Sequence, residues 1–238
     1  GVQSNVPPGE FCVRVVDVGQ GSAAVVDTAS YRLLVDTGPR FANRDVGRSN
    51  VLPVLRSTGP HHLNLLLLSH TDIDHAGGLS FFRAYFDVLP EIGPRDCTHG
   101  MSWQQDGVRF TTLQAKGLTS DNDLSCTLLL ASDEQTAYLS GDISARAERR
   151  LLEDLPEHIS LLLAPHHGSK TSSSMPFVRH LSPDIVVFSA GRANRYGHPH
   201  KHVVRRFTWE QSRQFNTATS GAIQWCSHRP DRVRQNRS

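Results

Sequence analysis

Residues 65–79 read LLLLSHTDIDHAGGL, four leucines followed at once by side chains that can bind metal ions. The apolar run extends over residues 63–69 and has the length and continuity of a strand buried on both faces. Two histidines and two aspartates then fall within positions 70–75. Because a rigid sheet can hold the loop at a strand end in place, the stretch predicts a buried strand with a polar site at its end.

The spacing inside this loop indicates two pairs of ligands. His70 and Asp72 alternate, so they project from the same side of an extended loop. Asp74 and His75 are adjacent and are expected in a turn, and the glycines at 77–78 permit the tight backbone that this turn needs. One pair could then bind one cation and the other pair a second. The alternatives are a single-metal site or acidic residues that only form the turn.

The composition is that of an ordinary globular chain, long enough at 238 residues for one large domain or two small ones. The 25 basic and 23 acidic residues give a formal net charge of +2, too small to indicate a polyanionic partner. Four cysteines without CxxC spacing argue against a zinc ribbon and leave disulfides open. No run approaches the ~20 apolar residues of a membrane span, and no signal peptide is recognised. Because the chain starts at Gly1 instead of Met, we expect a piece of a longer protein.

Hydrophobic periodicity predicts an alternation of strands and helices that recurs in both halves of the chain. Strands are predicted over 11–17, 23–27, 32–36, 63–69, 108–113, 126–132, 135–140, 159–164, 184–190 and 221–226. Helices are predicted over 49–57, 77–84, 145–154, 175–181 and 200–207. This order predicts one α+β domain, an αββα sandwich of two mixed β-sheets flanked by helices. We expect a flexible lead at 1–10, the domain at 11–228, and a basic tail at 229–238 that is disordered because it is poor in apolar residues.

Further polar residues follow other predicted strands, as the opening loop does. These residues are Asp36 after RLLV, Asp142 in LSGD, His166 and His167 in APHHGS, and His198 in GHPH. Loops at strand ends can aim side chains at a common point. We therefore interpret all these clusters as one site on one rim of the fold.

Two of these positions have competing interpretations. Taken alone, Asp142 could equally be the N-cap of the helix at 145–154, because Asp is a good cap. Its two carboxylate oxygens could instead bridge two cations, and beside the other clusters we favour the bridge. At least one of His166 and His167 is expected to be a ligand, and the sequence does not determine which.

Several motifs in order along the chain resemble a known family. They are VVDVGQG (15–21), LLVDTGPR (33–40), LLSHTDIDHAGG (67–78), DNDLSCTLLL (121–130), YLSGDI (138–143), LLLAPHHGSKTSSS (161–174) and SAGRANRYGHPH (189–200). Together they resemble the metallo-β-lactamase fold and, more narrowly, the metallo-β-lactamase-like domain at the C-terminus of the ComEC family of bacterial DNA-uptake channel proteins. The resemblance covers residues from about 11 to 226.

This resemblance implies a two-metal nuclease domain that degrades the DNA strand that is not transported during natural transformation. It implies metal ligands at His70, Asp72, Asp74, His75, Asp142 and His166 or His167. His198 would lie close to the scissile phosphate, and Asp36, Asn122 and Ser125 would support the ligands from behind. The expected partners are single-stranded DNA and the channel and OB-like domains of the same full-length protein. That protein would lie in the inner membrane with this domain on the outer side, and this part of the chain would not touch the membrane itself.

The chain departs from the wider superfamily in ways that bear on the metal. The usual first motif is HxHxDH, but Asp72 replaces its second histidine. The histidine expected between that motif and Asp142 is missing, and Asn122, Asp123 and Ser125 stand in that region. Fewer imidazoles and more carboxylates make the site harder, so we expect two divalent cations, with manganese favoured and zinc as the alternative. The same changes argue against β-lactam hydrolysis.

The expected reaction uses Asp74, Asp142 and His198 as catalytic residues. Three aspartates contribute about −3 against +4 from two divalent ions, and the resulting positive centre suits a phosphodiester anion. Asp142 would bridge the ions, a hydroxide would attack phosphorus in line, and His198 would hydrogen-bond a phosphate oxygen or protonate the leaving oxygen.

Two segments are candidate substrate contacts. Ser169, Lys170, Thr171 and Ser172 begin a helix and could seat a phosphate, although such segments are more often simple caps. The second segment contributes Asn194, Arg195 and His198 and lies in a basic stretch, for which a solvated charged face is the alternative. The rival functions are another phosphoesterase, acting on RNA or a phosphorylcholine ester, and a non-catalytic DNA-binding domain.

Overall fold

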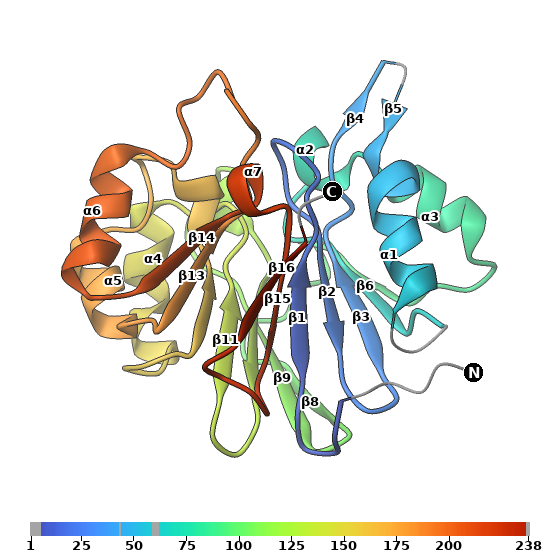
Figure 1. The fold of residues 1–238 in the computed structure, drawn as a ribbon, viewed down its shortest axis with the longest axis horizontal. Helices are drawn as coiled ribbons and strands as arrows, with labels where there is room; N and C mark the ends of the chain where they lie inside the picture. Colours follow the sequence, from blue (N-terminus) through green and yellow to red (C-terminus); the bar gives the residue numbers. More distant parts are fainter. Residues whose placement is uncertain (1–5, 43, 59–61, 237–238) are drawn as a thin grey trace.

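The computed structural model describes residues 6–42, 44–58 and 62–236. Two seven-stranded sheets stand face to face (Figure 1). The first has the order β16 (Val233–Asn236), β15 (Ala222–Cys226), β1 (Cys12–Val15), β2 (Ala24–Asp27), β3 (Arg32–Val35), β6 (Leu65–Leu67), β7 (Glu91–Ile92). The second has the order β14 (Arg213–Asn216), β13 (Ile185–Phe188), β12 (Leu161–Leu163), β11 (Thr136–Leu139), β10 (Thr127–Ala131), β9 (Val108–Leu113), β8 (Ser102–Gln105). A small separate hairpin pairs β4 (Arg40–Phe41) with β5 (Arg44–Asp45).

The two sheets bury their facing sides in one core because alternate strand residues point inward. Leu33 and Val35 of β3 point into this core, whereas Leu34 between them packs on the outer side of the sheet. The second sheet follows the same rule, with Leu161 and Leu163 inside and Leu162 outside. The central strands are therefore apolar on both faces, as the continuous runs in the sequence predict.

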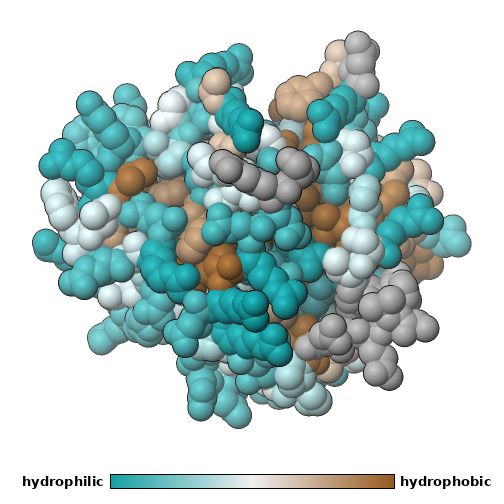
Figure 2. All heavy atoms as spheres, in the orientation of Figure 1, coloured by the Kyte–Doolittle hydropathy of each residue, from teal (hydrophilic) through white to brown (hydrophobic). Residues whose placement is uncertain are grey.

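Helices cover the outer face of each sheet, so the predicted αββα sandwich is confirmed. The first sheet is covered by η1 (Gly47–Val51), α1 (Leu52–Ser57) and α3 (Leu79–Tyr85), and the second by α4 (Ala145–Leu151), α5 (Met175–Leu181) and α6 (Lys201–Trp209). The short segments are α2 (Ile73–Ala76), η2 (Asn122–Leu124), η3 (Leu152–Asp154), η4 (Pro165–Gly168) and α7 (Thr217–Ser220). The face seen in Figure 2 is largely hydrophilic, with apolar residues in small hollows. Within the described ranges, no helix combines the length and the apolar character needed to cross a bilayer.

All ten predicted strands and all five predicted helices are present, with ends shifted by a few residues. The glycines at 77–78 were expected to permit a tight turn of the backbone, and this reason is wrong. Gly77 and Gly78 both have ordinary helical φ values, −59° and −85°. Gly77 must be glycine because the backbone of Arg40 passes very close to it. A Cβ atom there would lie 2.3 Å from the backbone nitrogen of Arg40.

The prediction of a disordered tail is wrong for the described part of the segment. Val233–Asn236 form β16, which pairs antiparallel with β15 at the edge of the first sheet. Polar, exposed residues suit an edge strand whose outer side faces water, so composition alone was misleading. Residues 237–238 of the tail and 1–5 of the predicted flexible lead lie outside the described residues. Within the lead, Val6 is buried and the Gly9 N–H donates to the Asp106 carbonyl at 2.6 Å.

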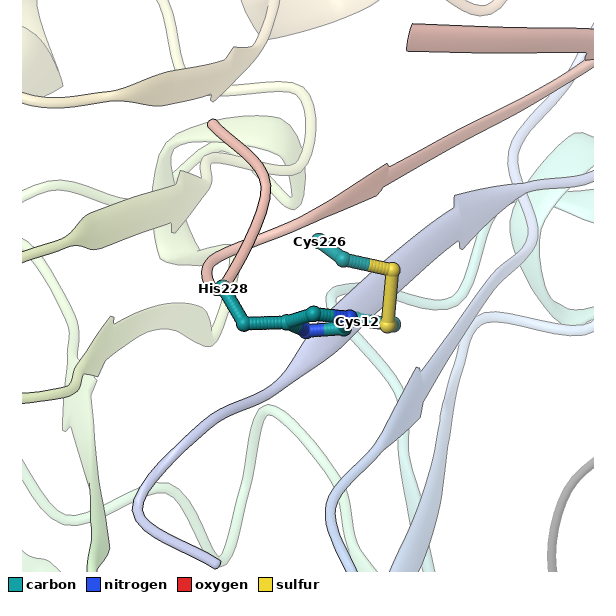
Figure 3. Close-up of side chains that lie close together, drawn as sticks. All are labelled: Cys12, Cys226 and His228. Carbon is teal, nitrogen blue, oxygen red and sulfur yellow. A yellow bond between two sulfur atoms is a disulfide. The ribbon is translucent and has the colours of Figure 1, made fainter. Parts of the chain in front are cut away.

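Two disulfides settle the question that the cysteine spacing left open. Cys12 of β1 is bonded to its directly opposed partner Cys226 of β15, and Cys97 is bonded to Cys126. Figure 3 shows His228 beside the first disulfide. These three side chains could otherwise form a metal site, but sulfurs joined to each other cannot serve as thiolate ligands. The bond between Cys12 and Cys226 instead ties the first strand of the chain to the last hairpin.

Removal of the Cys12–Cys226 disulfide should destabilise the fold more than removal of Cys97–Cys126. The first spans 214 residues of sequence and the second 29. In the chain-entropy model a disulfide that closes a longer loop constrains the unfolded state more. The model gives a contribution to the unfolding free energy of about 5 kcal/mol for the first bond and about 4 kcal/mol for the second. Urea denaturation of the two Cys→Ser double variants measures this difference in unfolding free energy. An equal or reversed order would contradict it.

Candidate metal centre

The candidate ligands follow strands whose carboxyl ends meet at one edge of the sandwich. β3 and β6 run parallel in the first sheet, and β11, β12 and β13 run parallel in the second. Asp36 follows β3, the loop at 69–72 follows β6, Asp142 follows β11, and residues 166–167 follow β12. Parallel strands present their following loops at the same edge, so four loops that are distant in sequence converge there.

One set of potential ligands consists of Asp74, His75, Asp142 and His167. Their ligand atoms all lie within 4.8 Å of one another. His75 Nε2 is 3.1 Å from Asp142 Oδ1 and 3.2 Å from His167 Nε2. His167 Nε2 is 3.3 Å from Asp74 Oδ2 and 3.5 Å from Asp142 Oδ2. These four side chains could therefore hold one metal ion.

A second set consists of His70, Asp72 and His166, and it adjoins the same carboxylate. His70 Nε2 lies 3.7 Å from Asp72 Oδ2 and 3.9 Å from Asp142 Oδ2. His166 Nε2 lies 3.6 Å from Asp142 Oδ2. The alternation of His70 and Asp72 thus brings them together as predicted, and both His166 and His167 reach Asp142.

Asp142 is not the cap of the following helix. Ser144 is the N-cap of α4, where its hydroxyl accepts the Arg146 N–H at 3.2 Å. The side chain of Asp142 is therefore free to face the imidazoles from both sets. Gly141 makes this placement possible, because its φ is +56° and a Cβ atom there would lie 2.9 Å from Ser125 and Ser69.

Asp36 fixes the orientation of two imidazoles at once. Its Oδ2 lies 2.7 Å from His75 Nδ1, and its oxygens accept hydrogen bonds from the Ser69 N–H and hydroxyl at 2.8 and 2.9 Å. Because the only hydroxyl hydrogen of Ser69 is donated to Asp36, its oxygen accepts from His70 Nδ1 at 3.0 Å. Both neutral rings therefore carry hydrogen on Nδ1 and direct an Nε2 lone pair into the centre.

His167 follows the same rule, because its Nδ1 lies 2.8 Å from the Ser189 carbonyl, which can only accept. His70 Nε2 and Asp142 Oδ1 are buried without a hydrogen-bond partner, even though Asp142 Oδ1 is close to His75. With neutral rings, several acceptors face one another here, which is costly unless a proton or cations lie between them. These nitrogen and oxygen atoms therefore fit divalent cations as ligands, and Asp142 adjoins both sets of potential ligands.

The backbone is unusual at three of these residues. Asp36, His166 and His167 have φ values of 59°, 50° and 57°, in the left-handed region that non-glycine residues rarely adopt. Such conformations cost about 1–3 kcal/mol each and cluster at functional sites. The rest of the fold therefore stabilises three strained backbone conformations, which direct these side chains toward the centre.

Charge and burial shift the pKa values in opposite directions. Burial alone would raise the pKa of Asp142, but the neighbouring imidazoles of His75 and His167 hold it well below its usual value. Burial lowers the pKa of His70. Burial and the charges of His167 and His166 lower the pKa of His198 to about 4. Asp142 is thus ionised and His198 neutral at pH 7.

His198 lies at the mouth of the centre, with its ring 5.8 Å from that of His166 and 6.2 Å from that of His167. Gln20 Oε1 accepts the Gly191 N–H, which directs the Gln20 amide nitrogen toward His198 Nδ1 at 3.4 Å. Because that nitrogen only donates, the neutral ring carries its hydrogen on Nε2. His198 can therefore donate a hydrogen bond to a substrate oxygen, whereas its low pKa argues against proton transfer to a leaving group.

Many of the polar groups in and directly after the predicted phosphate seat at 169–172 already have partners within the chain. The Ser173 and Ser174 N–H groups donate to the buried carboxylate of Glu148, the latter at 2.9 Å. Ser172 is buried and donates to the Ile143 carbonyl at 2.8 Å. Ser169 is buried too, and its hydroxyl pairs with the Thr171 hydroxyl at 3.0 Å. Of the four predicted residues, only Lys170 and Thr171 are exposed.

Other predicted residues support the centre or the loop instead of facing a substrate. Ser125 Oγ accepts the Asp142 N–H at 3.2 Å. Asn122 lies in η2 with no hydrogen bond to a candidate ligand. Asn194 is used within its own loop, because Oδ1 accepts the His198 N–H and Nδ2 donates to the Gly191 and His198 carbonyls. Arg195 is exposed.

Sequence reasoning missed three residues that organise the centre, namely Gln20, Ser69 and Ser189, and it missed Glu148, which orders the segment at 173–174. Ser69 and Ser189 stand directly beside predicted strand ends, which was the one signal available for them. Gln20 stands in the VVDVGQG motif, but nothing in that motif connects it with His198. Glu148 gave no signal, because it lies in the middle of a predicted helix.

Comparison with known proteins agrees with this geometry. The family model described as the metallo-beta-lactamase superfamily matches residues 16–169. The chain is 35% identical to competence protein ComA of Neisseria gonorrhoeae, over 92% of this chain and 33% of that protein. It is 33% identical to recombination protein 2 of Haemophilus influenzae, over 89% of this chain and 28% of that protein. The chain thus spans about a third of the length of the curated relatives it matches.

Solved structures share the fold at low sequence identity. The metallo-beta-lactamase fold protein YhfI from Bacillus subtilis superposes with a TM-score of 0.63 at 13% identity, covering 92% of this chain and 99% of that one. Igni18, a metallo hydrolase from Ignicoccus hospitalis, gives a TM-score of 0.57 at 13% identity, covering 90% and 98%. These likenesses concern the fold alone, and they agree with the two-sheet architecture.

Replacement of Asp36 by Asn should weaken metal binding without unfolding the chain. An amide nitrogen in place of Oδ2 would face His75 Nδ1 and could not accept its hydrogen, so the imidazole would lose its orientation. Loss of such a partner typically costs 10–100-fold in metal affinity, measured here by calorimetric titration with Mn²⁺ or Zn²⁺. Asp106→Asn is the matched control, because Asp106 accepts hydrogen bonds from Thr28 and Ser30 instead. Equal affinities for both variants would contradict the role of Asp36.

Metal binding should release a proton near neutral pH. In the metal-free chain, burial lowers the pKa of His75, but the charges of Asp142 and Asp36 outweigh it and raise the pKa well above the ordinary value. This proton stabilises the metal-free fold below the unfolded pKa of about 6.5, and the stabilisation is lost as pH rises through the folded pKa. Since a ligand histidine must be deprotonated, Mn²⁺ affinity should fall as pH falls. Calorimetry in buffers of different ionisation enthalpy measures the release, and a buffer-independent heat would contradict it.

Proposed function

The chain belongs to the metallo-β-lactamase superfamily, and from this membership we propose that it is a metal-dependent phosphodiesterase that cleaves DNA. The two curated relatives described above are named for competence and recombination. Their names support a role in DNA handling and do not by themselves specify a reaction.

The position of Asp142 is the observation that carries this proposal. One carboxylate faces His75 with one oxygen, and His70, His166 and His167 with the other. A carboxylate placed between two ligand sets is suited to bridge two cations, and two-metal sites are typical of enzymes that displace groups at phosphorus. Three aspartates against two divalent ions leave the centre about +1, which favours an anionic phosphodiester over a neutral amide.

Two divalent cations, when bound, would activate water and stabilise the entering and leaving oxygens. The residues of the chain then have separate tasks. Asp36 and Ser69 hold His70 and His75 in one orientation, and the Ser189 carbonyl does the same for His167. His198, neutral and with hydrogen on Nε2, holds a phosphate oxygen at the mouth. The predominance of oxygen and imidazole donors favours Mn²⁺, with Zn²⁺ as the alternative cation.

We place this domain in a membrane protein of DNA uptake, on the outer side of the inner membrane, beside the channel and OB-like domains of the same protein. There it would degrade the strand that is not transported. The two disulfides support an oxidising location, because disulfides persist outside the reducing cytosol.

A nuclease assay tests the proposal. The purified chain with Mn²⁺ should cleave end-labelled DNA, and Asp142→Ala should lower kcat by about 10²- to 10³-fold, because removal of one group that stabilises the transition state costs about this much. Asp133→Ala is the matched control, since Asp133 is an exposed aspartate in the turn between β10 and β11, at the opposite end of the sheet.

Parallel reactions with RNA and a phosphorylcholine ester separate this function from other phosphoesterases. Preferred turnover of either would replace DNA as the substrate. DNA binding without cleavage under Mn²⁺, Mg²⁺ and Zn²⁺ would leave only a binding function.

A further inference from the structure

The loop between β13 and α6 carries an exposed aromatic ring beside the centre. Tyr196 is 54% exposed, and Figure 1 shows its loop, residues 191–200, projecting from the edge of the sandwich. The loop is ordered by Asn194, which hydrogen-bonds the backbone of Gly191 and His198 at 2.7–2.9 Å. The ring is therefore held in a fixed place on the edge that carries the centre, where another molecule can reach it.

Tyr196 is connected to the metal centre by stacked rings. Its ring lies 5.5 Å from that of His198 at an interplanar angle of 23°. The His198 ring in turn lies 6.2 Å from that of His167 at 26°. A nearly parallel series of rings thus leads from a candidate metal ligand to solvent, and a planar group could continue it.

The surroundings of this ring are cationic. The Arg195 guanidinium carbon lies 4.9 Å from the centroid of the Tyr196 ring, and its Nη2 donates to the phenol oxygen at 2.7 Å. The segment 191–202, GRANRYGHPHKH, contains no acidic residue. A planar aromatic face beside fixed positive charge suits a group that is itself aromatic and joined to phosphates.

We propose that Tyr196 and Arg195 form a base-stacking subsite for the nucleotide next to the scissile phosphate. The base stacks on the ring and guanidinium, and the phosphate enters the metal centre beside His198. In a duplex both faces of each base are covered by neighbours, so this subsite engages an unpaired base. It is tolerant of sequence because every base has a π-face. The inference rests on the proposed phosphodiesterase function and specifies how its substrate is held.

The kinetic test compares Tyr196→Ala with Tyr196→Phe and with Trp209→Ala. Trp209 is the matched control, because it is 61% exposed and lies 5.6 Å from the Arg205 guanidinium, but at the last residue of α6. For a single-stranded oligonucleotide, Tyr196→Ala should raise KM roughly 5- to 150-fold at unchanged kcat. Tyr196→Phe and Trp209→Ala should stay within about twofold, since the first keeps the ring. On an oligonucleotide of abasic residues, Tyr196→Ala should match the wild type.

A binding measurement tests the subsite without cleavage. In the Asp142→Asn background, a single 2-aminopurine in the oligonucleotide should lose fluorescence on binding, and Tyr196→Ala should abolish that loss. Equal effects of Tyr196→Ala and Trp209→Ala, or an equal KM increase on the abasic oligomer, would overturn the subsite while cleavage by the wild type upholds the phosphodiesterase. If the wild type cleaves neither oligomer, the proposed function fails, and the fluorescence result still decides whether Tyr196 stacks a base.

Discussion

A buried, ionised carboxylate surrounded by imidazoles is the constraint on which the rest of the site depends. Asp142 is 3% exposed and His70 is fully buried. Burial of a charge costs several kcal/mol unless opposite charge lies against it. In the metal-free chain, a proton on His75 supplies that charge, and two cations would supply more of it. The left-handed backbone of Asp36, His166 and His167 and the glycine at 141 are then understandable as the geometry needed to bring this charge and its partners together.

The sequence predicted the central strands well because their apolar runs are continuous and have the length of a strand that is buried on both faces. Residues 70–75 were predicted as ligand candidates because two histidines and two aspartates stand directly after such a run, where the end of a rigid strand can direct them to one point. The edge strand β16 was not predicted, because an edge pairs on one side only and its residues remain polar. Hydrophobic periodicity reveals strands that are buried on at least one face, and the residues of β16 are mostly exposed.

The errors within the site have a common physical origin. Ser172 looked like a phosphate ligand because serines at a helix start often are, and nothing local reveals that Glu148 of another helix already occupies the neighbouring N–H groups. The cap interpretation of Asp142 was excluded by Ser144, which caps the helix instead. Hydrogen-bond partners that are distant in sequence decide which of several polar side chains remain available, and a one-dimensional pattern does not contain them.

The cysteines explain why the centre keeps hard donors. All four are consumed in two disulfides, and no cysteine in the described chain is free. Thiolates bind soft cations tightly and would compete with carboxylates for the metal. The Cys97–Cys126 bond adjoins Ser125, whose hydroxyl supports Asp142, and the Cys126 N–H donates to the Ser69 carbonyl at 2.7 Å. Oxidation therefore removes sulfur as a ligand and at the same time fixes the strand end that supports the carboxylate.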